Sequence, residues 1–318
     1  MPLTDAAPAR WTSPHLLGLA GVSAGALRSL LVRAREMGPR VRAHRKGEEL
    51  AGRVVANLFL EDSTRTRLSF TRAAQLLGAD VSDLTSSGSS VSKGETLADT
   101  ALTIAAMGVD AIVVRAAAPG AAAIVAGAVK CAVINGGDGC HEHPTQGLLD
   151  TYTLAEGAGR LDTFDLAGLR VLIVGDVVNS RVARSAIHAM TTLGARVVCV
   201  GPPALLPGSM ACMGCSVHRD FDKALDGADA VMMLRVQFER HLARGAIASP
   251  REYRRFYALT PERAERLPPK ALIMHPGPMN RGVEIDGSVY DLPRTVILKQ
   301  VTNGVAVRMA VLEACVGR

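Results

Sequence analysis

The sequence predicts an α/β protein built from two domains, each of them a parallel sheet flanked by helices. The chain has 318 residues, which is about twice the usual length of a single domain. Its composition, 48% hydrophobic and 21% charged, is ordinary for a protein with a sizeable core. Short apolar runs of strand length alternate with helical patterns along the chain, which is the spacing of βαβ units.

The elements of the first half follow an Ala- and Pro-rich start that is expected to fray. A helix is predicted from Ser23, because apolar residues recur at helical spacing, namely Leu27, Leu30, Leu31 and Ala34. Gly38-Pro39 is expected to stop this helix. Residues 54–60 are typical of a buried strand, and Ser63 then stands at the N-cap of a second helix. The expected apolar stripe of the second helix is Leu68, Ala73, Leu76 and Leu77.

The rest of the first half repeats this alternation. We predict a polar loop over residues 82–94, a helix over 96–107 and a short strand over 111–115. A further strand over 132–135 and a glycine-rich loop over 136–139 follow. The helix that starts after His143-Pro144 runs to about residue 156 and is the natural bridge between the two halves.

The second half begins with a fully apolar strand over residues 169–175, and Ser180 then opens a helix that runs to about residue 193. Further predicted elements are a strand over residues 196–200, a helix over 222–225 and a strand over 230–234. The last helix, over 305–315, is expected to pack back on the first half. The predicted domains are therefore residues 1–145 with the C-terminal segment 296–318, and residues 146–295.

Charge and composition exclude several classes of protein. The formal net charge is +6 without any run of five like charges, and aromatic residues make up only 3%, so a nucleic-acid partner is not expected. The sequence has no apolar stretch long enough for a membrane span. An apolar strand at residues 171–174 suggests a nicotinamide-binding fold, but the GxGxxG turn that such folds use is missing. We expect no cofactor.

Cysteine usage points to a reducing compartment. Six cysteines are sparse for this length, and the first residues lack the basic-then-apolar order of a signal peptide, so the cytoplasm is the expected location. Cys212 and Cys215 have the spacing of half a zinc site or of a redox pair. No partner pair stands at metal-ligand spacing in the sequence, so we interpret them as two reduced loop thiols and expect no metal.

The strongest chemical signal is Ser63-Thr64-Arg65-Thr66-Arg67, directly after a strand and at the start of a helix. The first turn of a helix has unpaired N–H groups and a partial positive charge, and hydroxyls and guanidiniums in the same turn suit a phosphate. The alternative is an ordinary capped helix with exposed arginines.

Further donors follow other strands. Arg115 ends one strand, and His143 and Gln146 lie at a helix start after another, so in a parallel sheet they project from the same edge as the phosphate turn. Such donors suit the polarisation of a carbonyl group, although a lone histidine is more often structural. In the second half, Arg181 and Arg235 follow strands and suit bidentate binding of carboxylates, unless they are simply surface arginines.

These segments resemble the aspartate/ornithine carbamoyltransferase family over residues 11–316. The motifs occur in the family's order and spacing: Ser63-Thr64-Arg65-Thr66-Arg67, Ser92-Lys93-Gly94-Glu95-Thr96, His143-Pro144-Thr145-Gln146, Arg235-Val236-Gln237 and His275-Pro276-Gly277-Pro278. The aspartate-specific branch is favoured, because ornithine-specific members carry a cysteine where Thr145 stands. The resemblance implies a carbamoyltransferase-like fold and transfer of a carbamoyl group from carbamoyl phosphate to L-aspartate, an early step of pyrimidine biosynthesis.

The resemblance also implies roles for individual residues. Carbamoyl phosphate would be bound through Ser63, Thr64, Arg65, Thr66, Arg115, His143, Gln146, Gly277 and Pro278, with a cis peptide before Pro278. The second domain would bind L-aspartate through Arg181, Arg235 and Gln237. The residues implied in catalysis are Arg65, Thr66, Arg115, His143 and Lys93.

The family's assembly implies that Lys93 enters the cleft of a neighbouring subunit and binds aspartate there, which makes a homotrimer with shared active sites. Glu61 would pair with Arg181 and Arg240, and residues 245–259 would form a mobile loop over aspartate. Three alternatives stay open at this point. The acceptor could be another amino acid, the chain could be a non-catalytic scaffold subunit, and a regulatory chain or a dihydroorotase could join the assembly.

Overall fold

In the computed structural model, residues 11–85, 95–236 and 249–317 are described. The chain divides into two compact units, unit 1 with residues 1–149, 161–164 and 302–318, and unit 2 with residues 150–160 and 165–301. The boundaries expected at 145 and 296 are therefore shifted. The reason is that two helices, α5 (Pro144–Gly157) and α12 (Ile297–Val316), each run from one unit into the other instead of ending at the boundary.

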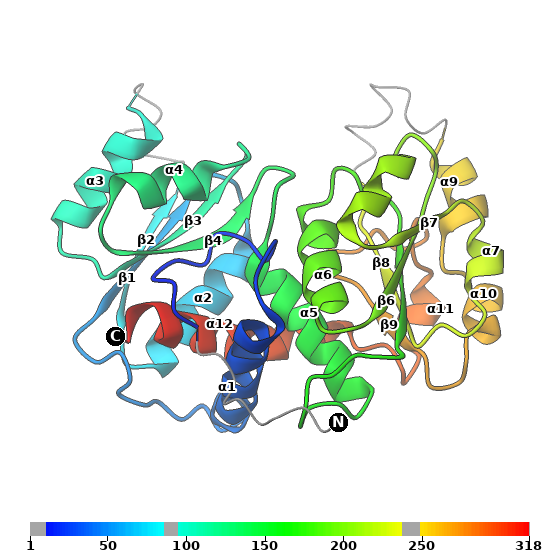
Figure 1. Cartoon of the computed structure of the whole chain (residues 1–318), viewed down its shortest axis with the longest axis horizontal. Coiled ribbons are helices and arrows are strands. Elements are labelled where there is room, and N and C mark those ends of the chain that lie inside the picture. Colours follow the sequence, from blue (N-terminus) through cyan, green and yellow to red (C-terminus); the bar gives the residue numbers. More distant parts are fainter. Residues whose placement is uncertain (1–10, 86–94, 237–248, 318) are drawn as a thin grey trace, which may run out of the picture. The chain divides into compact units, whose positions relative to one another are not determined.

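The described part of unit 1 has a four-stranded parallel sheet in the order β2-β1-β3-β4 (Figure 1). Its strands are β1 (Val54–Phe59), β2 (Asp80–Thr85), β3 (Ala111–Ala116) and β4 (Ala132–Asp138). Its helices, besides the ends of α5 and α12, are α1 (Ala24–Arg42), α2 (Thr64–Leu76), α3 (Leu97–Ala106) and α4 (Ala121–Ala128).

Successive side chains of β1 point to opposite faces of this sheet, and their contacts show which helices cover each face. Ala56 and Leu58 belong to a buried cluster with residues of α3 and α4. Asn57 points to the opposite face, where its amide donates to the Thr71 hydroxyl of α2 at 3.1 Å. Helices thus cover both faces, which explains why the central strands β1 and β3 are apolar along most of their length.

Several predictions for unit 1 were wrong in detail. Pro39 does not end α1, since the Ala43 N–H still donates to the Pro39 carbonyl at 3.0 Å. Residues 80–85 form the edge strand β2, where polar side chains are tolerated because they reach solvent. The strand β4 continues through Gly136 to Asp138. The helix α4 was not predicted, because its Ala-rich sequence lacks a polar face.

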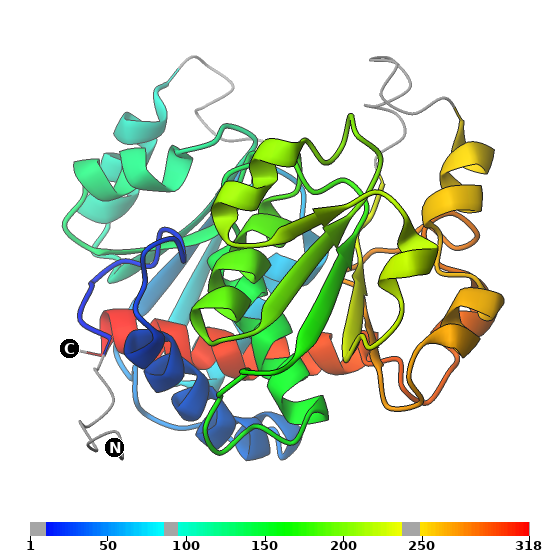
Figure 2. The same ribbon diagram turned by 45° about the vertical axis from the view of Figure 1, so that its right-hand side comes forward.

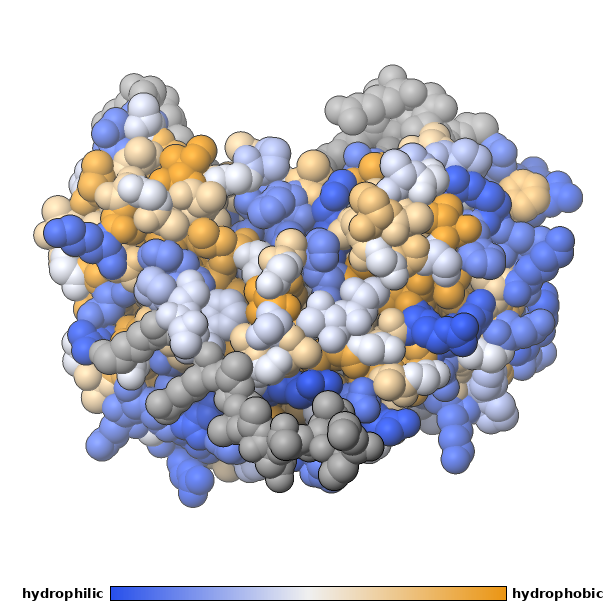
Figure 3. All heavy atoms as spheres, in the orientation of Figure 1, coloured by the Kyte–Doolittle hydropathy of each residue, from blue (hydrophilic) through white to orange (hydrophobic). Residues whose placement is uncertain are grey.

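Leu68 was also predicted wrongly, because it is 58% exposed instead of buried on the core side of α2. Unit 1 has other large exposed apolar side chains, namely Leu102, Met107 and Ile124. These three lie on or directly after α3 and on α4, and Figure 3 shows hydrophobic surface in the area where Figure 1 places these two helices.

The described part of unit 2 has a five-stranded parallel sheet in the order β7-β6-β5-β8-β9 (Figure 2). Its strands are β5 (Arg170–Val174), β6 (Arg196–Val200), β7 (Ser216–His218), β8 (Ala230–Met233) and β9 (Leu272–Met274). Its other elements are α6 (Arg181–Thr192), the 3₁₀ helix η2 (Gly208–Met213), α7 (Phe221–Ala224), α9 (Pro250–Tyr257), α10 (Pro261–Arg266) and α11 (Gly287–Tyr290).

The core of unit 2 also has helices on both faces of its sheet. Leu172, Val198 and Val231 pack in one cluster with apolar residues of α7, α10 and α11. The apolar side of α6 covers the other face. Strands β7 and β9 were missed by the sequence analysis because three residues give too little periodicity to recognise. Residues 250–257 form a helix whose Tyr253 is buried, so the prediction of a loop there was wrong.

The six cysteines are all free thiols, with Cys212 exposed and Cys215 buried. Among the described residues, no group of three or more His, Cys, Asp or Glu side chains is arranged to hold a metal ion. Likewise, none of the helices in the described ranges is long and apolar enough to cross a membrane.

The ion pair of Asp222 generates a prediction about stability and pH. Hydrogen bonds from Arg263, at 2.8 and 3.0 Å, lower the pKa of the Asp222 carboxyl. A lowered pKa in the folded state means that the pair stabilises the fold above the unfolded pKa of about 4 and that this contribution is lost as the pH falls. Because the carboxyl is partly exposed, Asp222→Asn should lower the free energy of unfolding at pH 7 by only about 1 kcal/mol.

Urea denaturation at pH 7 and at about pH 3 measures this difference, with Asp226→Asn as the matched control because Asp226 is an exposed carboxyl on the same segment. The difference in free energy of unfolding between wild type and Asp222→Asn should be smaller at the lower pH. An equal deficit at both pH values contradicts the assignment.

Candidate active site

The site in unit 1 starts at the turn that connects β1 to α2. Ser63 has extended backbone angles, φ −162° and ψ 90°, and takes the N-cap position, as predicted. In the described structure its hydroxyl makes no capping bond to the helix, and the first turn contains no acidic side chain. The backbone N–H groups of this turn and the Ser63 hydroxyl are therefore directed to an end of the helix where an oxyanion is favoured.

The hydroxyls and guanidiniums of this turn differ in exposure. Thr66 is buried, whereas Thr64 and Arg65 are exposed. Asp62, just before the turn, is exposed as well and adds one negative charge beside it. The start of α2 therefore combines a buried hydroxyl with an accessible cationic group.

Arg115 lies at the carboxyl edge of the same sheet. It stands opposite Phe59 in the register of β3 against β1. Its guanidinium donates to the Gly136 carbonyl of β4 at 3.1 Å and pairs with Glu61 at 3.4 Å. The side chain is only 11% exposed, so a cation is held next to the phosphate turn with limited access to water. The acid expected to pair with Arg181 and Arg240 thus contacts Arg115; Arg240 lies outside the described residues.

His143 immediately precedes α5, and both His143 and Gln146 are buried. The His143 carbonyl accepts the N–H groups of Gln146 and Gly147, at 2.9 and 3.1 Å, so His143 caps the first turn of this helix. The predicted donors Ser63, Thr64, Arg65, Thr66, Arg115, His143 and Gln146 therefore all follow or end strands of one parallel sheet.

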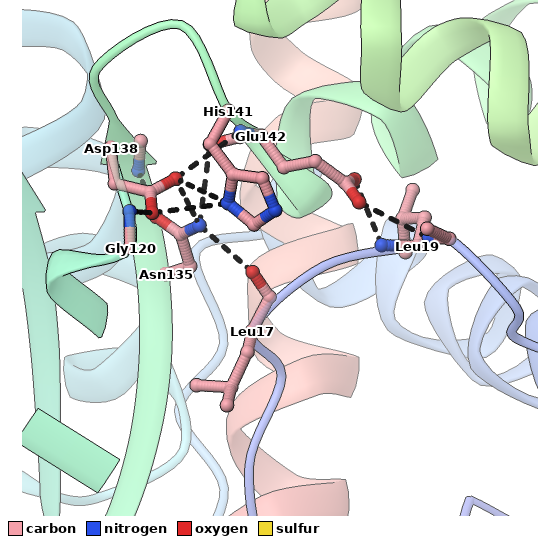
Figure 4. A network of polar contacts seen from close by, with 9 residues as sticks. Leu17, Leu19, Gly120, Asn135, Asp138, His141 and Glu142 are labelled. Carbon is pink, nitrogen blue, oxygen red and sulfur yellow. Dashed lines mark hydrogen bonds and ion pairs between the residues drawn. The ribbon is translucent and has the colours of Figure 1, made fainter. Parts of the chain in front are cut away.

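A network of polar contacts fixes the segment that carries His143 (Figure 4). Asp138, which is 1% exposed, accepts the Gly120 N–H at 2.7 Å and the Asn135 side-chain amide at 2.7 Å. It also accepts the Glu142 N–H at 3.2 Å and contacts the His141 ring at 3.1 Å. Sequence reasoning assigned Gly136 to Gly139 to a loop and missed Asp138; an acidic residue within that glycine run was the available signal.

Glu142 ties the start of the chain to this segment. Its carboxylate, on a residue that is 2% exposed, accepts the N–H groups of Leu19 at 2.8 Å and Ala20 at 3.1 Å (Figure 4). A methyl group added at Gly18 would lie 2.6 Å from the same carboxylate. Residues 16–20 are thus part of the structure that supports His143, which the sequence analysis did not predict.

The predicted residues of unit 2 stand at the carboxyl edge of its own sheet. Arg181 is the first residue of α6 after β5, and the exposed Arg235 follows β8. Gly277 and Pro278 follow β9, joined by the cis peptide bond that the resemblance implied. Strands β5, β8 and β9 are neighbours in the sheet, so these residues share one edge. Lys93 and Gln237 lie outside the described residues.

Two α/β units, each with cations and backbone donors gathered at the carboxyl edge of a parallel sheet, define a class of protein that binds small anionic ligands. Two family models match the chain. Residues 14–156 match the carbamoyl-P binding domain, and residues 167–315 the Asp/Orn binding domain, of the aspartate/ornithine carbamoyltransferases. The chain belongs to the aspartate/ornithine carbamoyltransferase family.

The chain is similar to curated relatives over nearly its whole length. It is 54% identical to the aspartate carbamoyltransferase catalytic subunit of Myxococcus xanthus over 306 residues, which cover 95% of this chain and 99% of the relative. It is 52% identical to the catalytic subunit of Rhodospirillum rubrum, with 96% of this chain and 95% of the relative covered.

Solved structures of the family have the same fold. One is aspartate transcarbamoylase from Trypanosoma cruzi in complex with carbamoyl phosphate and aspartate, with a TM-score of 0.83, 27% identity, and coverage of 96% of this chain and 95% of that one. Another is ornithine carbamoyltransferase from Pyrococcus furiosus, with a TM-score of 0.83, 28% identity, and coverage of 95% and 97%. The prediction of two parallel-sheet domains with a carbamoyltransferase-like fold is confirmed.

The contact between Gly18 and Glu142 generates a second prediction. Gly18→Ala should lower the free energy of unfolding by about 1 to 3 kcal/mol, because the added methyl group crowds the buried carboxylate. Glu142→Ala should also destabilise, because it leaves two backbone N–H groups without their acceptor. In the double variant the crowding is gone, so the two losses should not add.

Urea denaturation of the two single variants and the double variant measures the coupling. Gly127→Ala in α4 is the matched control, since an added methyl group there meets nothing within 4 Å and should be neutral or stabilising. Additive losses would show that the crowding inferred at Gly18 is absent.

Proposed function

We propose that the chain is the catalytic chain of an aspartate carbamoyltransferase. It transfers the carbamoyl group of carbamoyl phosphate to the amine of L-aspartate and gives N-carbamoyl-L-aspartate and phosphate. The amine nitrogen forms a bond to the carbonyl carbon, and the bond between that carbon and the phosphate oxygen breaks. The amine is deprotonated before attack or loses its proton to the departing phosphate, so the reaction needs no general base from the protein. We expect no cofactor.

Unit 1 binds carbamoyl phosphate. The N-terminal turn of α2 holds the phosphate through Ser63, Thr64, Arg65 and Thr66. Arg115, His143 and Thr66 donate to the carbonyl oxygen, which gains negative charge as the amine attacks. Gln146 and the backbone around Pro276 and Gly277 bind the carbamoyl nitrogen. Their positions at the carboxyl edges of the two sheets support these roles.

Unit 2 binds L-aspartate, with the guanidiniums of Arg181 and Arg235 and the Gln237 amide on its carboxylates. Lys93 comes from a neighbouring subunit, so the working assembly is a homotrimer with shared active sites. Exposed apolar side chains on α2, α3 and α4 support association with other copies. We place the enzyme in the cytoplasm, in the synthesis of pyrimidines. Regulatory chains or a dihydroorotase could join the trimer.

The observation that carries this proposal is the arrangement in unit 1. Three features belong to one sheet edge: a first turn of α2 without acidic residues, the nearly buried Arg115 opposite Phe59 in the strand register, and the buried His143 at the start of α5. Such an arrangement suits a ligand in which a phosphate is bonded to a carbonyl group. A ligand with only a phosphate or only a carbonyl group would leave some of these donors unused. The identity of about half of all positions with aspartate-specific relatives favours aspartate as the acceptor.

Product analysis tests the proposed reaction and its acceptor. Purified protein with carbamoyl phosphate should release phosphate and form N-carbamoyl-L-aspartate when L-aspartate is added, and should release none when L-ornithine is added. Arg115→Ala should reduce kcat/KM by about 10²- to 10³-fold, because one preorganised donor to the carbonyl oxygen is lost. Arg72→Ala, on the exposed part of α2 beside His44, is the control and should keep full activity. Reaction with ornithine, or binding of carbamoyl phosphate without turnover, contradicts the proposal.

Mixing of inactive variants tests the shared sites. Lys93→Ala and Arg65→Ala should each be inactive alone, because each variant lacks one half of every site. When the two proteins are dissociated, mixed and reassembled, up to about a quarter to a third of the wild-type activity should return, since mixed trimers contain some sites with both residues. Assembly size is followed by sedimentation. Mixed trimers without recovered activity would show that each chain has a self-contained site.

A further inference from the structure

The loop after β9 in unit 2 contains a buried acid that the proposed reaction does not use. Glu284 is 0% exposed and His275 is 1% exposed. The His275 Nε2 atom lies 3.1 Å from Glu284 Oε1, and the same oxygen accepts the Asn280 N–H at 2.5 Å. On the other side of the ring, the Gly277 N–H donates to His275 Nδ1 at 2.7 Å. Glu284 and His275 therefore link both ends of residues 275–284.

These contacts determine where the proton of the His275 ring lies. A backbone N–H is always a donor, so Nδ1 must be the acceptor in its bond with Gly277 and carries no proton. The proton is then on Nε2, which donates to the Glu284 carboxylate. The ring is the neutral Nε2–H tautomer, and Glu284 is the group that selects it.

The tautomer sets the direction of the Pro276–Gly277 peptide. This peptide is trans, because the cis bond recorded in this loop is the next one, Gly277–Pro278. In a planar trans peptide the C=O and N–H bonds point in opposite directions. With the Gly277 N–H held on the His275 ring, the Pro276 carbonyl points away from the ring. An acceptor is thus presented from a fixed backbone.

The same cluster also fixes the loop to its surroundings within unit 2. The Gln300 side chain accepts the His275 N–H at 3.0 Å and donates to Asp150 at 2.7 Å. The Asn280 side-chain amide donates to the Val236 carbonyl at 2.9 Å, directly after Arg235. The loop that carries Gly277 and the segment that carries Arg235 are therefore held together.

We propose that Glu284 and His275 are positioning residues for the carbamoyl nitrogen. Glu284 selects the Nε2–H tautomer of His275, the free Nδ1 lone pair holds the Gly277 N–H, and the Pro276 carbonyl is thereby directed to accept a carbamoyl N–H group. This inference rests on the proposed function, because it takes carbamoyl phosphate as the ligand of this loop.

The first test needs no variant. Nitrogen-15 NMR of the uniformly labelled wild-type chain distinguishes the two neutral tautomers and the imidazolium form, and His275→Asn identifies the signal of His275 among the eight histidines. At pH 7.5 the ring should be the neutral Nε2–H tautomer. An Nδ1–H tautomer or an imidazolium ring overturns the proposal.

The second test is calorimetric binding of carbamoyl phosphate without aspartate. Glu284→Leu keeps the side-chain volume but removes the acceptor, and it should weaken binding by about tenfold or more, as expected for one misplaced hydrogen-bonding group. Glu284→Gln keeps an acceptor oxygen for His275 and should stay within about threefold of wild type. Asp222→Asn is the control for a destabilised unit 2, because it loses a charged hydrogen bond far from this loop in sequence.

The outcomes separate this role from the proposed function. If wild-type protein binds no carbamoyl phosphate, the proposed function fails. If wild-type protein binds it and Glu284→Leu binds it equally well, only the positioning role fails. The role is supported when Glu284→Leu alone is weakened and Glu284→Gln and Asp222→Asn are not.

Discussion

The parallel direction of the strands is the constraint on which the rest of this structure depends. Because β1, β3 and β4 run the same way, the residues that follow each strand come out at one edge, so three distant segments of sequence lie along the same edge of the sheet. The register places Arg115 opposite Phe59, just before the phosphate turn. An antiparallel β3 would put that guanidinium at the other end of the sheet. The same argument holds in unit 2, where neighbouring strands β5, β8 and β9 lead to Arg181, Arg235 and Gly277.

Acidic and basic side chains have different roles at the sheet edges of this chain. Three buried acids accept hydrogen bonds from backbone N–H groups: Asp138 from Gly120 and Glu142, Glu142 from Leu19 and Ala20, and Glu284 from Asn280. These bonds fix the loops at the sheet edges, and bonds of this kind are costly to leave unmade in a buried place. The cations, in contrast, lie at strand ends and helix starts. Rigid loops and cations at their borders are what electrostatic catalysis requires, because the donors are in place before charge develops on the substrate.

The sequence was sufficient to predict the fold class, most strands and the start of α2 at Ser63, because strand burial and helix N-caps are local signals. It failed where tertiary context decides. Pro39 stays inside α1, Leu68 faces solvent, residues 80–85 form a polar edge strand, and β7 and β9 are too short to show a period. The acids that support the site were missed for a similar reason. Nothing in the sequence around Asp138, Glu142 or Glu284 tells which distant N–H groups these carboxylates bind. Lys93 and Gln237 lie outside the described residues, and their roles still rest on resemblance.

The central claim is that the turn between β1 and α2 binds the phosphate of carbamoyl phosphate. Backbone amide NMR shifts during titration with carbamoyl phosphate, and with inorganic phosphate as a second ligand, test this claim most directly. We expect saturable shifts for the amides of Thr64, Arg65 and Thr66 with both ligands, and shifts near Arg115 and His143 that are larger with carbamoyl phosphate. Saturable shifts confined to other parts of the chain, with the α2 turn unchanged, would contradict it.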